Sequence, residues 1–89
     1  MELEQLRNFV AVARCGSFTK AAKQLYISHS TTSRSVSALE AELGLRLLER
    51  ENRVLGLTPA GERLLREAEE ILKAVDSLKD KLVEKEEMV

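Results

Sequence analysis

The sequence predicts a mainly α-helical protein with one short β-hairpin and a long C-terminal helix. Apolar residues recur at spacings of three and four over most of the 89 residues, and the chain has only one proline and four glycines. A polar run near residue 50, flanked by short apolar stretches, interrupts this periodicity and indicates the hairpin. A chain of this length forms one small domain that buries only about 60% of its unfolded surface, which favours an additional stabilising device such as dimerisation.

Three helices are expected in the first half of the chain. The first ends at Gly16, a good C-terminal cap, and its apolar stripe consists of Leu3, Leu6, Phe9, Val10 and Ala13. The second begins after the N-cap Ser17, and its apolar residues are Phe18, Ala21, Ala22 and Leu25. The third runs from the N-cap Ser28 to Gly44, and its buried arc consists of Thr32, Val36, Leu39 and Leu43. Tyr26 is expected to pack in the turn between the second and third helices.

The second half of the chain predicts a hairpin and then one long helix. Residues 45–57 form the hairpin, with a polar tip at residues 49–53. Thr58 and Pro59 then supply an N-cap and a first-turn proline, and no proline or glycine follows Gly61, so the helix spans roughly 28 residues, or about 40 Å. Its apolar residues fit a heptad with two seam positions, occupied by Leu64, Ile71 and Leu78 and by Ala68, Val75 and Leu82. Because such a helix overruns a domain of about 58 residues, a partner helix explains the seam better than packing back onto the same domain.

Charge is distributed unevenly along the chain. The formal net charge is −1, which at first sight speaks against a nucleic-acid partner. However, no acidic residue lies between Glu4 and Glu40, and this stretch carries five lysines and arginines. From Thr58 onward there are nine acidic and six basic residues. The near-neutral net charge is therefore the sum of a basic first half of the chain and an acidic second half. A polyanion would bind to the basic half.

The second and third helices are joined by about three residues, which is the helix-turn-helix arrangement. Opposite its buried arc the third helix carries mainly small polar side chains, and a DNA major groove is wide enough to admit such a helix. Arg34 is the one long donor on this face, and its planar guanidinium suits guanine or a phosphate. Serine and threonine are poor choices for a helix interior, so their presence favours a functional surface over a merely solvated one.

The chain offers no credible catalytic or metal site. The single cysteine, Cys15, cannot form an intramolecular disulfide, and one histidine, His29, cannot complete a Cys/His zinc site. There is no nucleophile–base pair and no phosphate-cradling glycine loop, so we expect neither enzyme activity nor a cofactor. No apolar run approaches the roughly 20 residues of a membrane span, and the N-terminus lacks the basic start of a signal peptide. We therefore expect a cytoplasmic protein without a membrane partner.

Several short motifs follow one another in a fixed order. They are Phe9-Val10-Ala11-Val12-Ala13, the run from Gly16 to Leu25, Ser33-Arg34, Leu39-Glu40, Leu43-Gly44 and Leu57-Thr58-Pro59-Ala60-Gly61. In this combination they resemble the N-terminal DNA-binding domain of LysR-type transcriptional regulators, over essentially the whole chain. The resemblance implies a winged helix-turn-helix over residues 1–58, with three helices and a short two-stranded wing, and a dimerising linker helix over residues 59–89. It also implies a C-terminal effector-binding domain that is absent from this chain.

The resemblance further implies a bacterial, homodimeric regulator that binds double-stranded DNA sequence-specifically at dyad-symmetric promoter sites. The recognition helix would enter the major groove and the wing would lie at the minor groove; full-length regulators could form tetramers and bind a small-molecule effector through the missing domain. The expected DNA-binding residues are Phe18, Thr19, Lys20, Lys23, Ser28, His29, Ser30, Thr31, Ser33, Arg34, Ser37, Arg50 and Arg53. The expected dimerisation residues are Leu64, Ala68, Ile71, Val75, Leu78 and Leu82.

The chain departs from the family pattern at two places. The family usually has Ser-Gln-Pro where this chain has Ser28-His29-Ser30, and Leu-Phe where it has Leu47-Leu48. The first change removes a glutamine that often reads bases, so the preferred half-site cannot be copied from relatives. The second is a core substitution of modest consequence.

Three alternatives stay open at the level of sequence. His29 either contacts DNA or is a neutral, solvated side chain. Arg50 and Arg53 either reach DNA from the wing or pair with Glu49 and Glu51. The rival function is a protein-interaction module in which the coiled coil is the active part and the helix-turn-helix is only a scaffold.

Overall fold

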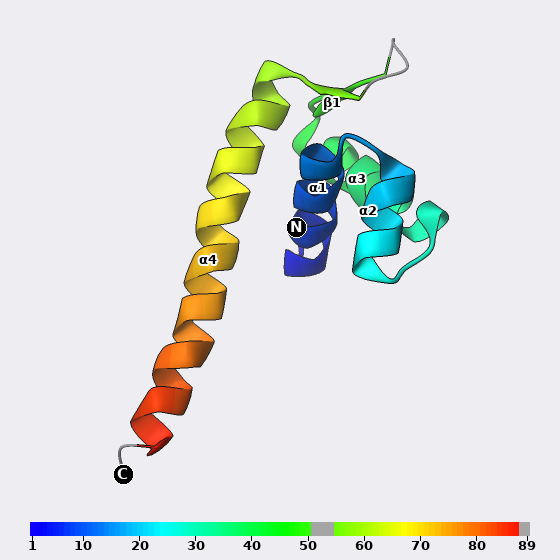
Figure 1. Cartoon of the computed structure of the whole chain (residues 1–89). Coiled ribbons are helices and arrows are strands. Elements are labelled where there is room, and N and C mark those ends of the chain that lie inside the picture. The colour runs from blue at the N-terminus through cyan, green and yellow to red at the C-terminus, as the bar shows by residue number, and fades with distance from the viewer. Residues whose placement is uncertain (51–54, 88–89) are drawn as a thin grey trace.

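The computed structural model describes residues 1–50 and 55–87, which form a winged helix-turn-helix followed by a long helix (Figure 1). The elements are α1 (Leu3–Cys15), α2 (Phe18–Leu25), α3 (His29–Leu43), β1 (Leu48–Glu49), β2 (Gly56–Leu57) and α4 (Pro59–Glu87). The two strands are antiparallel, with Leu48 opposite Leu57 and Glu49 opposite Gly56. The predicted fold class is confirmed. Within the described ranges, no helix has the length and apolar character needed to cross a membrane.

The capping residues set most of the helix boundaries, as predicted. The side-chain oxygens of Ser17, Ser28 and Thr58 each accept a hydrogen bond from a backbone N–H three residues further on, at 3.0–3.2 Å. Gly16 and Gly44 end α1 and α3 in the left-handed conformation, with φ of 65° and 66°. Local sequence signals therefore place the C-terminal ends of α1 and α3 and the N-terminal ends of α2, α3 and α4.

The turn between α2 and α3 differs from the prediction. Tyr26 does not pack in this turn, because its side chain is 94% exposed. It is instead the C-terminal cap of α2, with a left-handed φ of 58°, a conformation that glycine adopts more easily. The N–H of Ile27 donates to the carbonyl of Ala22 at 3.1 Å and closes the turn. Ile27, not Tyr26, is the half-buried residue.

The hydrophobic core lies between α1, α2, α3, β1 and the first part of α4. Its largest fully buried apolar side chains are those of Phe9, Leu39, Leu47, Val12 and Val36. Asn8 is buried as well, and its Nδ2 donates to Ser35 Oγ at 2.7 Å, which fastens α1 to α3 and satisfies both groups.

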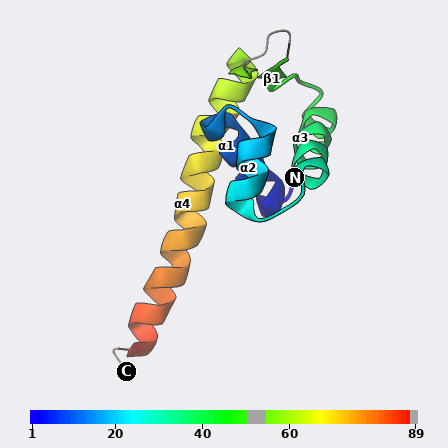
Figure 2. The same cartoon turned by 45° about the vertical axis from the view of Figure 1, so that its right-hand side comes forward.

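Only the first part of α4 is packed against the rest of the domain (Figures 1 and 2). Ala68, predicted to lie in a dimer interface, is 0% exposed and belongs to the domain's own core, together with Leu72. Arg7 donates to Asp76 Oδ1 at 3.2 Å, and Arg14 donates to Glu69, so two ion pairs also join α1 to α4. Beyond Asp76 the helix continues away from the domain, which gives the molecule extents of 55 × 25 × 19 Å.

Candidate nucleic-acid interface

A cluster of hydroxyl groups surrounds the N-terminus of α3. Ser28 Oγ lies 2.8 Å from Thr31 Oγ1 and 3.2 Å from Ser30 Oγ, and it accepts the backbone N–H of Thr31 at 3.1 Å. All three residues are exposed. Each hydroxyl can make further hydrogen bonds, and the helix N-terminus favours negative charge. This end of α3 can therefore bind a phosphate or the edge of a base.

The rest of the α3 surface divides largely as the sequence predicted, except that Leu43 of the predicted buried arc is only half-buried. Thr32, Val36 and Leu39 are buried, and Thr32 Oγ1 donates to the Ser28 carbonyl at 3.0 Å. On the other side of the helix His29, Arg34 and Ser37 are exposed, and Ser33 is half-buried. The exposed face thus presents small side chains and one long cationic one to solvent.

The residues predicted on α2 fall into two groups. Thr19, Lys20 and Lys23 are exposed and available to a partner. Phe18 is half-buried against the core, and its ring centre lies 5.8 Å from that of His29. Phe18 therefore joins α2 to the start of α3, a role that its predicted DNA contact did not include.

The wing shows a pairing that the sequence did not reveal. Arg50, directly after β1, donates to Glu40 Oε1 on α3 at 3.2 Å instead of pairing with its neighbour Glu49. Its guanidinium carbon also lies 5.5 Å from the Phe18 ring centre. Arg53 lies outside the described residues. A hollow of about 250 Å³ at the base of the wing is lined by Arg46, Leu48, Glu49, Arg50 and Thr58.

Sequence reasoning missed two residues beside the candidate interface. Glu40 accepts the N–H of Leu47 at 2.9 Å as well as the Arg50 bond, and the available signals were its place in the Leu39-Glu40 motif and as the first acidic residue after Glu4. Arg46, exposed beside the wing, was not singled out. Within the part of the chain that the structure describes, no group of three or more His, Cys, Asp and Glu side chains could hold a metal ion.

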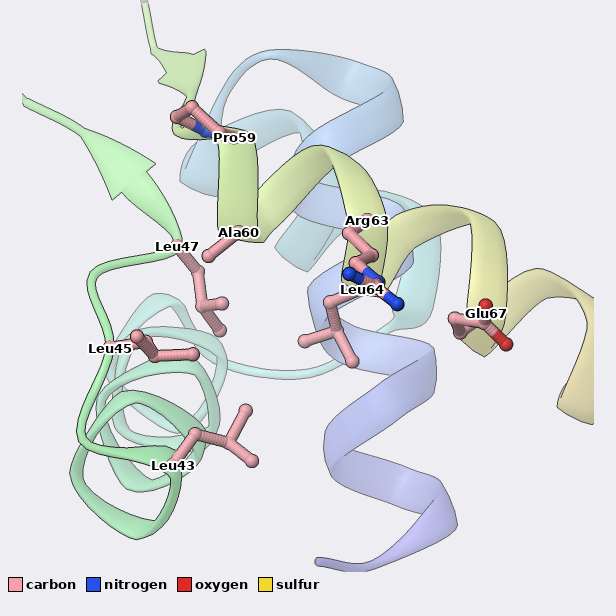
Figure 3. A pocket seen from close by; sticks show the side chains of 8 residues that line it. All are labelled: Leu43, Leu45, Leu47, Pro59, Ala60, Arg63, Leu64 and Glu67. Carbon is pink, nitrogen blue, oxygen red and sulfur yellow. The ribbon is translucent and has the colours of Figure 1, made fainter.

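An apolar surface continues from the end of α3 along α4. A groove of about 490 Å³ lies between the two helices, and Figure 3 shows Leu43 and Leu64 pointing toward each other across it. The groove is lined by Leu43, Leu45, Leu47, Pro59, Ala60, Arg63, Leu64 and Glu67. Further along α4 the apolar side chains at the surface are those of Ile71, Val75, Leu78, Leu82 and Val83, of which all but the half-buried Val75 are exposed.

The sequence of the winged helix-turn-helix matches a known family. The model described as "Bacterial regulatory helix-turn-helix protein, lysR family" matches residues 3–62, which is more than half of the chain. The chain belongs to the LysR family. The resemblance noted in the sequence motifs is thereby confirmed.

Characterised LysR relatives are longer than this chain. The HTH-type transcriptional regulator TcbR of Pseudomonas sp. strain P51 is 47% identical over 72 residues, which cover 81% of this chain and 24% of TcbR. The HTH-type transcriptional regulator BenM of Acinetobacter baylyi is 46% identical over 78 residues, which cover 88% of this chain and 26% of BenM. This LysR-family chain therefore spans about a quarter of the length of such relatives.

Solved LysR-family domains share the same fold. The DNA-binding domain of BenM, solved in complex with catB site 1 DNA, has a TM-score of 0.92 at 43% identity and covers 94% of this chain and 93% of its own. The DNA-binding domain of CbnR, solved in complex with DNA, has a TM-score of 0.88 at 41% identity and covers 96% of this chain and 98% of its own. The winged helix-turn-helix and the long helix of this chain thus occur together in both domains.

Proposed function

We propose that this LysR-family chain binds double-stranded DNA sequence-specifically as a homodimer, with α3 in the major groove and the wing at the minor groove. The observation that supports this most strongly is the exposed face of α3, where hydroxyl groups cluster at the helix N-terminus and Arg34 is exposed further along the helix. The likeness to the BenM domain in its DNA complex, at a TM-score of 0.92, supports the same function.

The chemistry of the main expected contact residues indicates which part of the DNA each would bind. Arg34 is exposed on α3 and can bind guanine through its planar fork, while His29, Ser30 and Thr31 lie where a recognition helix meets base edges. Lys20 and Lys23 on α2 would add affinity through phosphates without adding sequence information. Arg53 would contact the minor groove from the wing.

The dimer would form through the apolar stripe of α4. Leu78 and Leu82 are 59% and 57% exposed, and both follow Asp76, the residue of α4 that pairs with Arg7 of α1. Burying two such leucines against a second copy would gain roughly 1.5–3 kcal/mol for each side chain. A two-fold dimer also matches a dyad-symmetric DNA site.

We infer an antiparallel arrangement of the two α4 helices. The apolar groove lies beside the start of α4, whereas Leu78 and Leu82 lie near its end. Only antiparallel helices bring the far end of one copy to the groove of the other. An antiparallel pair of α4 helices would cover both the groove and the exposed leucines near the end of α4. With Cys15 replaced by serine, a copy carrying Leu64→Cys should cross-link to a copy carrying Leu82→Cys, and cross-linking of Leu64→Cys to itself would support parallel helices instead.

The remaining functions belong to a longer protein. The regulators that this chain matches are more than three times its length, so control by a small-molecule effector and assembly into tetramers would depend on parts of such a regulator that this chain does not match. The proposed role is transcription regulation in the bacterial cytoplasm, without enzyme activity.

Fluorescence anisotropy tests the proposal. The chain is titrated against a labelled duplex selected from a random pool and against a random duplex, each at several salt concentrations. Micromolar or tighter binding to the selected duplex, falling steeply with salt, supports the proposal. A selected site with two inverted halves supports the dimer. Absence of binding at every salt concentration would refute the proposal and favour the rival protein-interaction module, in which α4 is the active part.

A further inference from the structure

Arg50 is held by contacts with the protein itself. Its Nη2 donates to Glu40 Oε1 at 3.2 Å, and its guanidinium carbon lies over the Phe18 ring at 5.5 Å from the ring centre. Lys20 and Arg34, by contrast, have exposed side chains and take part in none of the ion pairs found among the described residues. The two contacts direct the Arg50 side chain toward the protein.

Glu40 is a firm partner for Arg50. The Glu40 side chain is only 10% exposed, and its Oε2 accepts the backbone N–H of Leu47 at 2.9 Å and, at 3.4 Å, that of Leu48. Hydrogen bonds to a carboxylate are stronger than neutral ones, and a nearly buried carboxylate that loses its cation is costly. One side chain of α3 therefore fixes both the start of β1 and the arginine that follows it.

Phe18 links this pair to the N-terminus of the recognition helix. Its ring contacts Arg50 on one hand and the imidazole of His29 on the other, with the two aromatic rings tilted by 53°. His29 is the first residue of α3 and is exposed, at the position where a recognition helix meets base edges. A continuous set of contacts thus runs from Glu40 through Arg50 and Phe18 to His29.

We propose that Arg50 is a positioning residue for base reading: Glu40 and Arg50 hold the Phe18 ring, and the ring fixes the imidazole of His29 at the N-terminus of α3. This inference rests on the proposed DNA-binding function. Arg50 then contributes to sequence preference without contacting a phosphate. The wing and the recognition helix are coupled through this side chain.

The first test uses the free protein. His29 is the only histidine in the chain, so its ring proton resonances in the NMR spectrum are unambiguous, and they depend on the distance and tilt of the Phe18 ring. Arg50→Ala and Glu40→Gln should both shift them. Arg66→Ala is the matched control, because it removes the same charge from an exposed position on α4 and should leave them in place. Unshifted His29 resonances in Arg50→Ala would overturn the proposal.

The second test measures DNA preference. Arg50→Ala should lower the affinity for the selected duplex about tenfold, the scale of one lost base contact, and leave the affinity for random DNA and the salt dependence unchanged. In a His29→Ala background the same change should have no further effect. An equal loss on both duplexes, with the salt slope reduced by about one, would make Arg50 a phosphate contact and overturn the proposal.

Glu40→Gln distinguishes a positioning role of Arg50 from an effect that comes only from loss of the wing structure. The amide retains an oxygen that can accept the Leu47 N–H but no longer carries the charge that holds Arg50. Freed from Glu40, Arg50 should bind random DNA more strongly while the preference for the selected duplex falls. An unchanged preference would contradict the coupling. Failure of the unmodified protein to bind any duplex would refute the proposed function itself, whereas the resonances of His29 report on the contact set independently.

Discussion

Replacing Gly61 by alanine tests how closely the start of α4 packs against the backbone of Leu47, the residue before β1. Gly61 lies in the first turns of α4, and a Cβ atom there would lie 2.0 Å from the carbonyl oxygen of Leu47 and 3.0 Å from its carbonyl carbon. Both are backbone atoms, so no side-chain rotation can relieve the contact. The Leu47 oxygen would have to move by more than 1 Å to reach an ordinary carbon–oxygen distance of about 3.4 Å.

Two opposing effects set the magnitude. In a helix, alanine is favoured over glycine by about 1 kcal/mol. Against this, forcing a methyl group into a packed site costs about 1–3 kcal/mol, and the displaced Leu47 oxygen also accepts the N–H of Thr58 at 3.1 Å, a bond worth about 1 kcal/mol. We expect the free energy of unfolding to fall by about 1–3 kcal/mol.

Urea denaturation at fixed protein concentration, followed by circular dichroism, measures this change. Gly56→Ala is the control, because the one atom of the described residues within 4 Å of a Cβ at Gly56 is Glu49 Oε2, at an ordinary contact distance of 3.7 Å. Gly56→Ala should leave the stability nearly unchanged. If Gly61→Ala were as stable as the unmodified protein, the contact between α4 and Leu47 would not have the closeness on which the reasoning depends.

Four further substitutions probe the turn, the recognition helix, the apolar stripe of α4 and the core. Tyr26→Gly should raise the free energy of unfolding by about 1 kcal/mol in the same assay, because glycine adopts a φ of 58° without steric cost and the 94% exposed ring has few contacts to lose; reduced stability would contradict this. Arg34→Ala should weaken binding to selected DNA by about 1–3 kcal/mol and relax sequence preference in anisotropy titrations; equal losses on selected and random DNA would reduce Arg34 to a phosphate contact. Leu78→Asp should yield a folded monomer in sedimentation velocity, whereas Ala68→Asp should unfold the domain because Ala68 lies in its core. A dimer of Leu78→Asp would move the interface elsewhere.

The helices were predictable because their signals are local. Ser17, Ser28 and Thr58 cap the helices that they were expected to cap, since a hydroxyl and the N–H groups it satisfies lie within three residues of each other. The same holds for Gly16 and Gly44, whose lack of a side chain permits a positive φ. Periodicity likewise placed the buried arc of α3.

The sequence was less informative where a residue's partner is distant in the chain. The heptad of α4 could not distinguish Ala68, which faces the chain's own core, from Leu78, which is exposed, because helical spacing does not show which element packs on which side. Glu40 was noted only as part of a motif, and its role could not be predicted because its partners lie seven to ten residues further along the chain. The prediction that Tyr26 packs in the turn was wrong. Its aromatic ring suggested burial, but Tyr26 is the C-terminal cap of α2 and its side chain is exposed.

The shared core between α4 and the rest of the domain has a consequence for the spacing of DNA half-sites. Ala68 and Leu72 fix the direction of the α4 axis relative to α3, so a dimer that pairs two α4 helices would present its two recognition helices at one separation and one relative rotation. About 5 inserted base pairs between the half-sites would turn one of them to the opposite side of the duplex, where a rigid dimer cannot follow. About 10 inserted base pairs would return that half-site to its original side of the duplex, but they would add some 34 Å to the distance between the two half-sites. A promoter for this protein should therefore tolerate base changes at its centre better than insertions.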